Sequence, residues 1–150
     1  MLTEDRIERE TLIEAPIERV WALVCEPGWW AAQDKADVAG TIARQGETVM
    51  APNSTYGDFP VRVERVDPPT YVSFRWASAF PGQEIRADNS TLIEFTLADE
   101  DGKTRLRVVE SGFGGLAGGD ELRRKALEDN TGGWAEEIAN LKTRAEQRSA

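Results

Sequence analysis

Histidine is absent from this sequence, and cysteine occurs only once, at Cys25. A Ser-His-Asp triad is therefore excluded, and a nucleophilic Cys25 would lack the imidazole base that usually activates such a thiol. Zinc sites are built mainly from cysteine and histidine side chains. We therefore expect no metal and no cofactor, and the single cysteine excludes an internal disulfide.

Basic residues and long apolar runs are also scarce. The 18 lysines and arginines face 27 acidic residues, for a formal net charge of −9. Because nucleic acids and anionic membranes both attract clustered basic residues, neither is an expected partner. No apolar run approaches the roughly 20 residues that span a bilayer, and residues 1–6 lack a signal-peptide pattern. The sequence predicts a cytoplasmic protein without membrane insertion.

The composition is typical of one globular domain. The chain has 150 residues, of which 40% are hydrophobic and 30% are charged. A chain of this length can bury a full core without disulfides or metals. No internal repeat or linker divides it, so we expect a single domain over residues 1–150. Both a monomer and a homodimer are compatible with the sequence.

The hydrophobic pattern predicts an antiparallel sheet preceded by a strand and two short helical segments. Residues 4–14 read as a first strand, the apolar spacing after Pro16 as a helix, and Trp29-Trp30 as the start of a second short helix or loop. From residue 38 onward the apolar period is two. The six further candidate strands, separated by Gly, Pro and Asp turn residues, are 38–44, 47–50, 61–66, 71–76, 91–97 and 104–111.

One face of this sheet is apolar, and the C-terminal segment supplies its cover. Asp120 is a suitable cap for a helix after the glycine-rich stretch 112–119. Gly132-Gly133 weakens the middle of that helix, and we expect a bend or a close approach to the sheet there. The helix carries one apolar stripe, formed by Leu127, Thr131, Trp134, Ile138, Leu141 and Ala145.

These elements predict an α+β helix-grip fold, in which a curved antiparallel sheet of about six or seven strands wraps around a long C-terminal helix. Two short helices follow the first strand. Such a sheet closed by one helix often leaves space at its wide end, where ligands bind.

The ordered series of motifs resembles the START-like (SRPBCC) superfamily, in the branch of homologues of the heat-shock-chaperone ATPase activator. The segments that carry the resemblance are residues 13–21, Trp29-Trp30, 63–69, 71–76, 101–106, 110–113, and Gly133-Trp134 with Ile138 and Leu141. The resemblance implies a domain of the kind that binds lipids, hormones or polyketides, with some catalytic members. Many relatives have a histidine near the end of the last strand, where this chain has Glu110, and the activators usually have a second domain.

The residues expected to line a pocket are mostly aromatic. Strand alternation points Glu110 into that pocket, as a ligand-orienting acceptor or as a general base. The favoured alternative places it at the open sheet edge or in a pair with Arg123 or Arg124, since buried acids are usually paired. Trp29 and Trp30 are interpreted as a lid with one exposed ring, or as an interface. The pocket candidates are Trp76, Phe74, Phe95, Glu110, Trp134, Ile138 and Trp30.

Three functions are compatible with these features. The first is non-catalytic binding of a hydrophobic or amphipathic small molecule, in a cavity of several hundred cubic ångströms between sheet and helix. The second is a protein interaction module in the style of a chaperone cofactor. The third is a cyclase- or hydrolase-like enzyme that uses Glu110 with Asp58, Tyr56 or Arg86. The ranking follows this order, and no residue is assigned a catalytic role.

Overall fold

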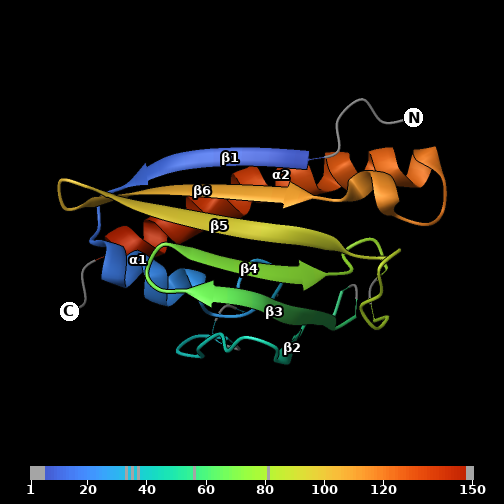
Figure 1. Cartoon of the computed structure of the whole chain (residues 1–150), viewed down its shortest axis with the longest axis horizontal. Helices are drawn as coiled ribbons and strands as arrows, with labels where there is room; N and C mark the ends of the chain where they lie inside the picture. Colours follow the sequence, from blue (N-terminus) through green and yellow to red (C-terminus); the bar gives the residue numbers. More distant parts are fainter. Residues whose placement is uncertain are drawn as a thin grey trace.

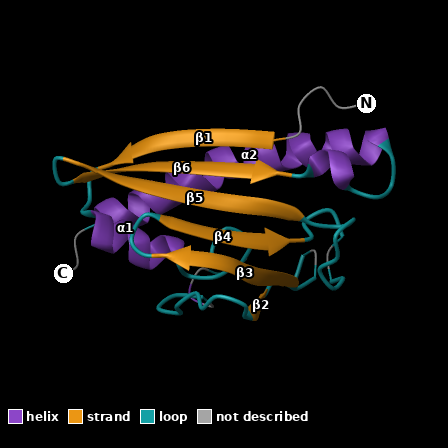
Figure 2. Cartoon of the chain, viewed as in Figure 1, coloured by secondary structure: helices purple, strands orange, loops and turns teal. Residues whose placement is uncertain are grey.

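A computed structural model describes residues 6–32, 34, 36, 38–55, 57–80 and 82–147. The chain forms one six-stranded antiparallel sheet with a short helix near its start and a long helix at its end (Figures 1 and 2). In chain order the elements are β1 (Arg6–Ile13), α1 (Ile17–Val24), β2 (Thr48–Ala51), β3 (Phe59–Asp67), β4 (Tyr71–Trp76), β5 (Thr91–Glu100), β6 (Lys103–Ser111), the 3-10 turn η2 (Phe113–Gly115) and α2 (Asp120–Glu146).

The sheet is a meander that the first strand completes. Its order is β1-β6-β5-β4-β3-β2, so that each strand from β2 to β5 pairs with the next one along the chain. β1 then pairs with β6, with Ile7 opposite Glu110. The long helix α2 lies across one face of the curved sheet (Figure 1), which confirms the predicted α+β helix-grip fold.

A tight hairpin fixes the register of β5 and β6, and therefore the position of Glu110. Asp101 and Gly102 both have positive φ angles, 55° and 84°, as two-residue hairpin turns require. The pairing Glu100↔Lys103 closes the hairpin and propagates to Ile93↔Glu110. Since side chains opposite each other share a face, Glu110 points to the same apolar side as Ile93.

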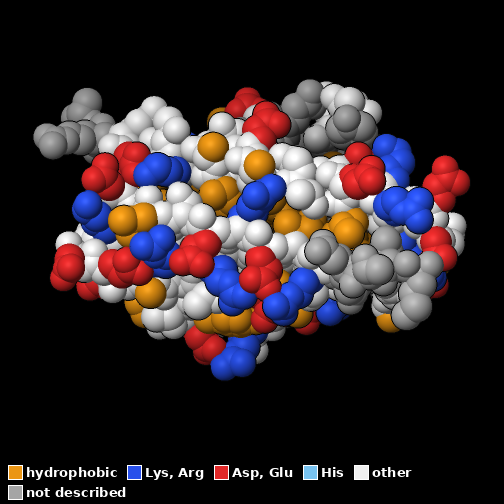
Figure 3. Space-filling view, turned by 90° about the horizontal axis from the view of Figure 1, so that it is seen from above, with side chains coloured by type: hydrophobic (Ala, Val, Ile, Leu, Met, Phe, Trp, Pro, Cys, Tyr) orange, Lys and Arg blue, Asp and Glu red, His pale blue; other side chains and the backbone are white. Residues whose placement is uncertain are grey.

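The core lies between the inner face of the sheet and the helices α1 and α2. Alternation along β4 buries Val72, Phe74 and Trp76, as the sequence predicts. The opposite face of the sheet is charged, with ion pairs such as Arg107–Glu8 across β6 and β1. Figure 3 shows one face of the molecule, on which acidic and basic side chains are interspersed with small apolar areas. The buried side chains of α2 are Ala126, Trp134, Ile138, Leu141 and Ala145.

Several local predictions are wrong. Residues 38–44 form a turn and an irregular segment instead of a strand, since Val38 and Ala43 are buried without alternation and Ile42 is exposed. The segment that Trp29 and Trp30 open, for which the sequence allows a short helix or a loop, is a hydrogen-bonded turn at these two residues.

Two predictions about α2 also differ from the structure. The cap residue is Gly119, and Asp120 is the first residue of the helix. The helix runs through Gly132 and Gly133 without interruption. A β-carbon added at either glycine would meet no atom within 4 Å, so the expected close approach to the sheet is wrong.

None of the described helices combines the length and the apolar composition that crossing a bilayer would require.

Candidate binding pocket

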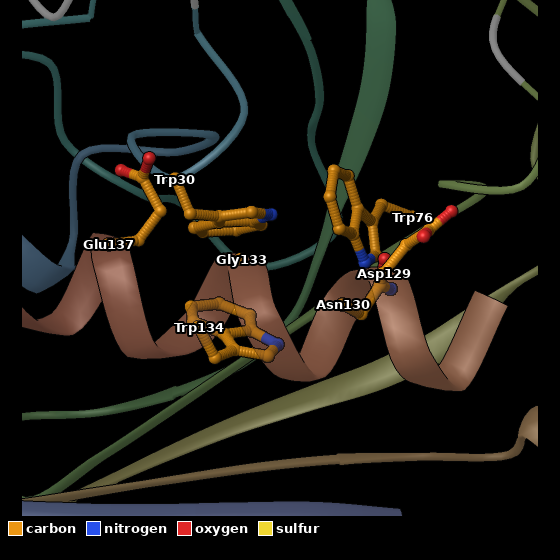
Figure 4. Close-up of a pocket in the computed structure, with 7 residues that line it drawn as sticks. All are labelled: Trp30, Trp76, Asp129, Asn130, Gly133, Trp134 and Glu137. Carbon is orange, nitrogen blue, oxygen red and sulfur yellow. The ribbon is translucent and has the colours of Figure 1, made fainter. Parts of the chain in front are cut away.

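A small pocket opens where the middle of α2 faces the end of β4 and the turn after α1 (Figure 4). Its volume is about 60 Å³. Gly133 is part of its wall, and the open space beside its backbone shows that a missing side chain contributes to the opening. The lining residues are Trp30, Trp76, Asp129, Asn130, Gly133, Trp134 and Glu137.

A glycine in the turn after α1 allows Trp30 to reach this position. Gly28 has a φ of 79°, and a β-carbon there would lie only 2.7 Å from the β-carbon of Ala51. A larger residue would therefore be strained by its backbone angle and would collide with β2. The tight turn carries Trp29 and Trp30 inward, where both are buried. The expectation that one of them is an exposed lid is wrong.

The aromatic rings pack against one another around the pocket. The Trp30 ring centroid lies 5.0 Å from that of Phe74, 5.8 Å from Trp76 and 5.9 Å from Trp134. Trp29 is packed against Phe95 at 5.7 Å, deeper in the core. These rings fill the space between sheet and helix, so the expected cavity of several hundred cubic ångströms is not found at this interface in the described part of the chain.

Glu110 forms hydrogen bonds with three of the lining residues and is completely buried, with 0% of its surface exposed. Its carboxylate accepts hydrogen bonds from the indole N–H groups of Trp76 at 2.8 Å and Trp134 at 2.7 Å. Thr91 donates its hydroxyl at 2.5 Å, and Asn130 donates its amide to both oxygens at 3.1 and 3.2 Å. One carboxylate therefore joins β4, β5, β6 and α2.

Burial raises the pKa of Glu110 above the ordinary value of 4.5, because the charged form is costly in an apolar interior. The four donors act against this rise, since each stabilises the charged carboxylate. All four are neutral groups, and the structure gives Glu110 no cationic partner among the described residues.

Both parts of the favoured sequence interpretation of Glu110 are wrong. β6 lies between β1 and β5, so Glu110 is not at a sheet edge. Arg123 instead donates to the carbonyl oxygen of Leu116 and pairs with Asp120. Neutral donors thus satisfy the hydrogen-bonding capacity of Glu110, for which the sequence suggests an arginine. The sequence analysis did not identify Asn130 as one of these donors. A usable signal existed, because Asn130 lies one helical turn before Trp134 and so faces the same side.

The structure brings together some of the predicted site residues. Trp30, Trp76 and Trp134 line the pocket, and Glu110 binds the indole N–H groups of the last two. The other three candidates, Phe74, Phe95 and Ile138, are buried in the surrounding core and do not line the opening.

The residues that sequence reasoning proposed for catalysis do not meet at Glu110. Arg86 interacts with Gln83 and Asp88, and Asp58 accepts a hydrogen bond from the backbone of Asn53. Tyr56 lies outside the described residues. Cys25 is buried and burial raises its pKa to about 12, so its thiol stays protonated at neutral pH.

Comparison with known proteins identifies the family of this chain. Residues 14–146 match the family model described as activator of Hsp90 ATPase homolog 1-like protein. The chain belongs to this family. A search of curated protein sequences found no match.

Solved structures confirm the fold of this family member at low sequence identity. Protein MLL2253 from Mesorhizobium loti is 19% identical, with a TM-score of 0.72 over 97% of this chain and 99% of that one. The Aha1 dimer from Colwellia psychrerythraea is 18% identical, with a TM-score of 0.68 over 95% and 97%. CalU16 from Micromonospora echinospora is 15% identical, with a TM-score of 0.63 over 96% and 76%.

Proposed function

We propose that this protein binds a small hydrophobic or amphipathic organic molecule without transforming it, and that one end group of the molecule enters the tryptophan-lined pocket. The observation that carries this proposal is the meeting of Trp30, Trp76 and Trp134 at an opening beside Gly133, where the buried Glu110 accepts hydrogen bonds from Trp76 and Trp134. Apolar walls with a few fixed polar groups are the usual composition of a small-molecule site.

The energetics of two residues support a binding role. Gly133 lowers helix stability by about 1 kcal/mol relative to alanine, although the space beside it would accept a side chain. Glu110 is a buried acid, and its charged form is costly in an apolar interior. Helix propensity therefore does not account for the gap, and desolvation opposes the buried carboxylate. Together Gly133 and Glu110 keep a space open and hold two indole rings at its wall.

The size of the pocket limits what enters it. A volume of about 60 Å³ exceeds the ~10–15 Å³ that one water needs, and is far below the ~300 Å³ of a small drug-sized site. We therefore assign to the pocket one end of the ligand, with the remainder lying over its mouth.

The surroundings of Glu110 favour binding over catalysis. A general base needs a free lone pair within hydrogen-bond reach of the substrate proton. Both oxygens of Glu110 already accept hydrogen bonds from protein groups and neither is exposed. Its role in this proposal is to orient Trp76 and Trp134.

The alternative of a chaperone cofactor has less support from the surface. The family description refers to an activator of the Hsp90 ATPase. A docking surface for another protein usually includes an exposed apolar patch. Among the described residues, the exposed large hydrophobic side chains are Ile42 and Met50.

A fragment screen tests the proposal. A library of small amines, alcohols, ketones and carboxylic acids is titrated into the protein, and the indole N–H signals of the tryptophans are followed by NMR. We expect a subset to shift the Trp30, Trp76 and Trp134 signals in a saturable manner. Gly133→Leu should abolish these shifts, whereas Gly132→Leu, on the exposed neighbour, should retain them. The proposal fails if no compound binds, or if Gly133→Leu binds as wild type does.

A further inference from the structure

We propose that the end group recognised at the pocket is an uncharged carbonyl, whose oxygen accepts a hydrogen bond from the indole N–H of Trp30. This inference rests on the proposed function and specifies the chemical class of the ligand, a small apolar molecule that carries a ketone or an ester. It follows from which hydrogen-bonding groups around the pocket are already used and which one remains.

Most N–H donors in the pocket wall are consumed by the protein itself. Trp76 and Trp134 both donate to Glu110. The side-chain amide of Asn130 donates to Glu110 and to the hydroxyl oxygen of Ser78 at 2.9 Å. Because an indole has one N–H and an amide group has two, these side chains have no donor left for a ligand.

Trp30 is the exception among the tryptophans of the lining. Its indole nitrogen is buried and, among the residues that the structure describes, has no hydrogen-bond acceptor. Such a donor is costly, because it has lost water without gaining a partner. In Figure 4 the nitrogen-bearing end of the ring points toward Trp76, and the two rings meet at 88°. The face of an indole is a much weaker acceptor than an oxygen, so this N–H remains for a ligand.

A tilt of the Trp30 ring gives a ligand access to this donor. Neighbouring atoms cover the nitrogen, so an acceptor reaches it only when the ring moves. Trp76 and Trp134 are held in place by their hydrogen bonds to Glu110. Within the described chain, no hydrogen bond fixes the indole nitrogen of Trp30. The open space beside Gly133, in the same lining, leaves room for the movement. Trp30 is therefore the adjustable wall of the pocket.

The charge around the pocket disfavours an anionic end group. Asp129 and Glu137 place two acidic side chains in the lining, which includes no lysine or arginine among the described residues. The net charge of −9 repels anions at longer range. A carboxylate that entered would lose its hydration without gaining a cationic partner.

A protonated amine does not match the pocket either. Asp129 already pairs with Lys125 at 3.1 Å, and Glu137 also has an interaction within the protein. The two acids lie about two helical turns apart on α2, so one end group does not meet both. The unused group in the wall is a donor, and an ammonium, which only donates, cannot bond to it. An uncharged acceptor is the end group that remains.

A carbonyl oxygen meets these conditions with the fewest further demands. It has two lone pairs and brings no donor of its own, whereas a hydroxyl brings a hydrogen that also needs an acceptor. The group is planar and small, which suits an opening of about 60 Å³ between indole rings. The apolar remainder of the molecule then lies over the mouth of the pocket.

Four probes of nearly equal size separate this inference from the proposed function. 2-Pentanone, 2-methyl-1-pentene, pentylamine and pentanoate are each titrated into isotope-labelled protein at pH 7, and the assigned indole N–H signals are followed by NMR. The alkene has the shape of the ketone, with a CH₂ group in place of the oxygen. We expect 2-pentanone to bind about tenfold more tightly than the other three, because only it satisfies the buried donor. It should also move the Trp30 N–H signal downfield, as a new hydrogen bond does.

The possible outcomes distinguish the two proposals. If the alkene, the amine or the carboxylate binds as tightly as 2-pentanone, the carbonyl inference is wrong and the binding function stands. The same holds if 2-pentanone binds but leaves the Trp30 N–H signal in place. If none of the four probes binds, both proposals fail.

Matched Trp→Phe substitutions identify the donor. Trp30→Phe removes the N–H and enlarges the pocket for both probes, so the informative quantity is the ratio of ketone affinity to alkene affinity. This ratio should fall from about ten to about one. The control, Trp21→Phe, removes an indole N–H from α1 outside the pocket lining and should leave the ratio unchanged. A ratio in Trp30→Phe equal to that of wild type would overturn the inference. If Trp30→Phe does not fold, the shift of the Trp30 signal in wild type decides.

Discussion

Glu110 and Trp134 are joined across the interface between sheet and helix by a hydrogen bond of 2.7 Å from the indole nitrogen to a carboxylate oxygen. The bond links the end of β6 to the middle of α2, as do the hydrogen bonds that Asn130 donates to the same carboxylate. Its partner from β4, Trp76, approaches the other oxygen. The buried carboxylate thus fixes the directions of two of the rings that line the pocket.

The first prediction concerns this network. Glu110→Gln replaces one acceptor oxygen with an NH₂ group that faces other donors. At least one of the groups that donate a hydrogen bond to Glu110 therefore loses its acceptor. We expect a loss of about 1–3 kcal/mol in the free energy of unfolding at pH 5, measured by urea denaturation. Glu128→Gln, at an exposed helix position, should stay within about 0.5 kcal/mol. A Glu110 variant as stable as this control would show that the network contributes little.

The second prediction is a pH dependence that belongs to Glu110. Its folded-state pKa is raised above the ordinary value of 4.5, so the folded protein holds this proton more tightly than the unfolded chain does. The stabilisation is complete below pH 4.5 and is lost as pH rises through the folded-state pKa. Other carboxylates titrate in the same range, so the informative quantity is the stability of wild type minus that of Glu110→Gln.

This difference should fall with increasing pH above 4.5, by at most about 1.4 kcal/mol per pH unit. Urea denaturation of both proteins from pH 4 to pH 8 measures it. A difference that stays constant, or that grows with pH, would show that the folded-state pKa of Glu110 is not raised.

The fold was predictable from local patterns, whereas the network was not. The alternation of Val72, Phe74 and Trp76 is visible in the sequence, because a half-buried strand has a period of two. The partners of Glu110 come from 19 to 34 residues away, and which of them reach it depends on strand register and rotamers. The usual rule that a buried acid pairs with a base therefore pointed to the wrong partner, Arg123.

The wrong predictions of a strand over residues 38–44 and of a large cavity between sheet and helix have similar explanations. Residues 38–44 contain apolar residues, but Val38 and Ala43 are five positions apart and follow no alternation. The position of Trp29 and Trp30 depends on the turn at Gly28, which no periodic pattern describes. Since these two indoles occupy much of the space under α2, the volume of the pocket could not be read from the sequence.

The third prediction compares the two adjacent glycines of α2. Alanine at either position should raise the free energy of unfolding by about 0.5–1 kcal/mol, because alanine is the better helix former and its β-carbon meets no atom within 4 Å. Gly133→Ala also narrows the pocket, so it should weaken ligand binding, whereas Gly132→Ala should not. Thermal unfolding and ligand titration on the same samples measure both effects. Equal binding by the two variants would contradict a role for the gap.

The fourth prediction places a second acid beside Glu110. Asn130→Asp hardly changes shape, but it replaces the amide nitrogen that lies 3.1 and 3.2 Å from the Glu110 oxygens with an acceptor. Two carboxylates at this distance cannot both be ionised without strong repulsion, so they share a proton and their pKa values are raised in the folded state. Stability is then retained at low pH and lost as pH rises.

We expect Asn130→Asp to lose about 3 kcal/mol or more at pH 7, as happens when a buried charge has no compensating partner, and to recover part of this loss at pH 4.5. Asn130→Ala serves as the control, because it removes the same donor without adding charge and its loss should depend much less on pH. Urea denaturation of both variants at the two pH values gives the comparison. If the two losses have the same pH dependence, the side chain at position 130 does not lie close enough to Glu110 for their protons to be linked.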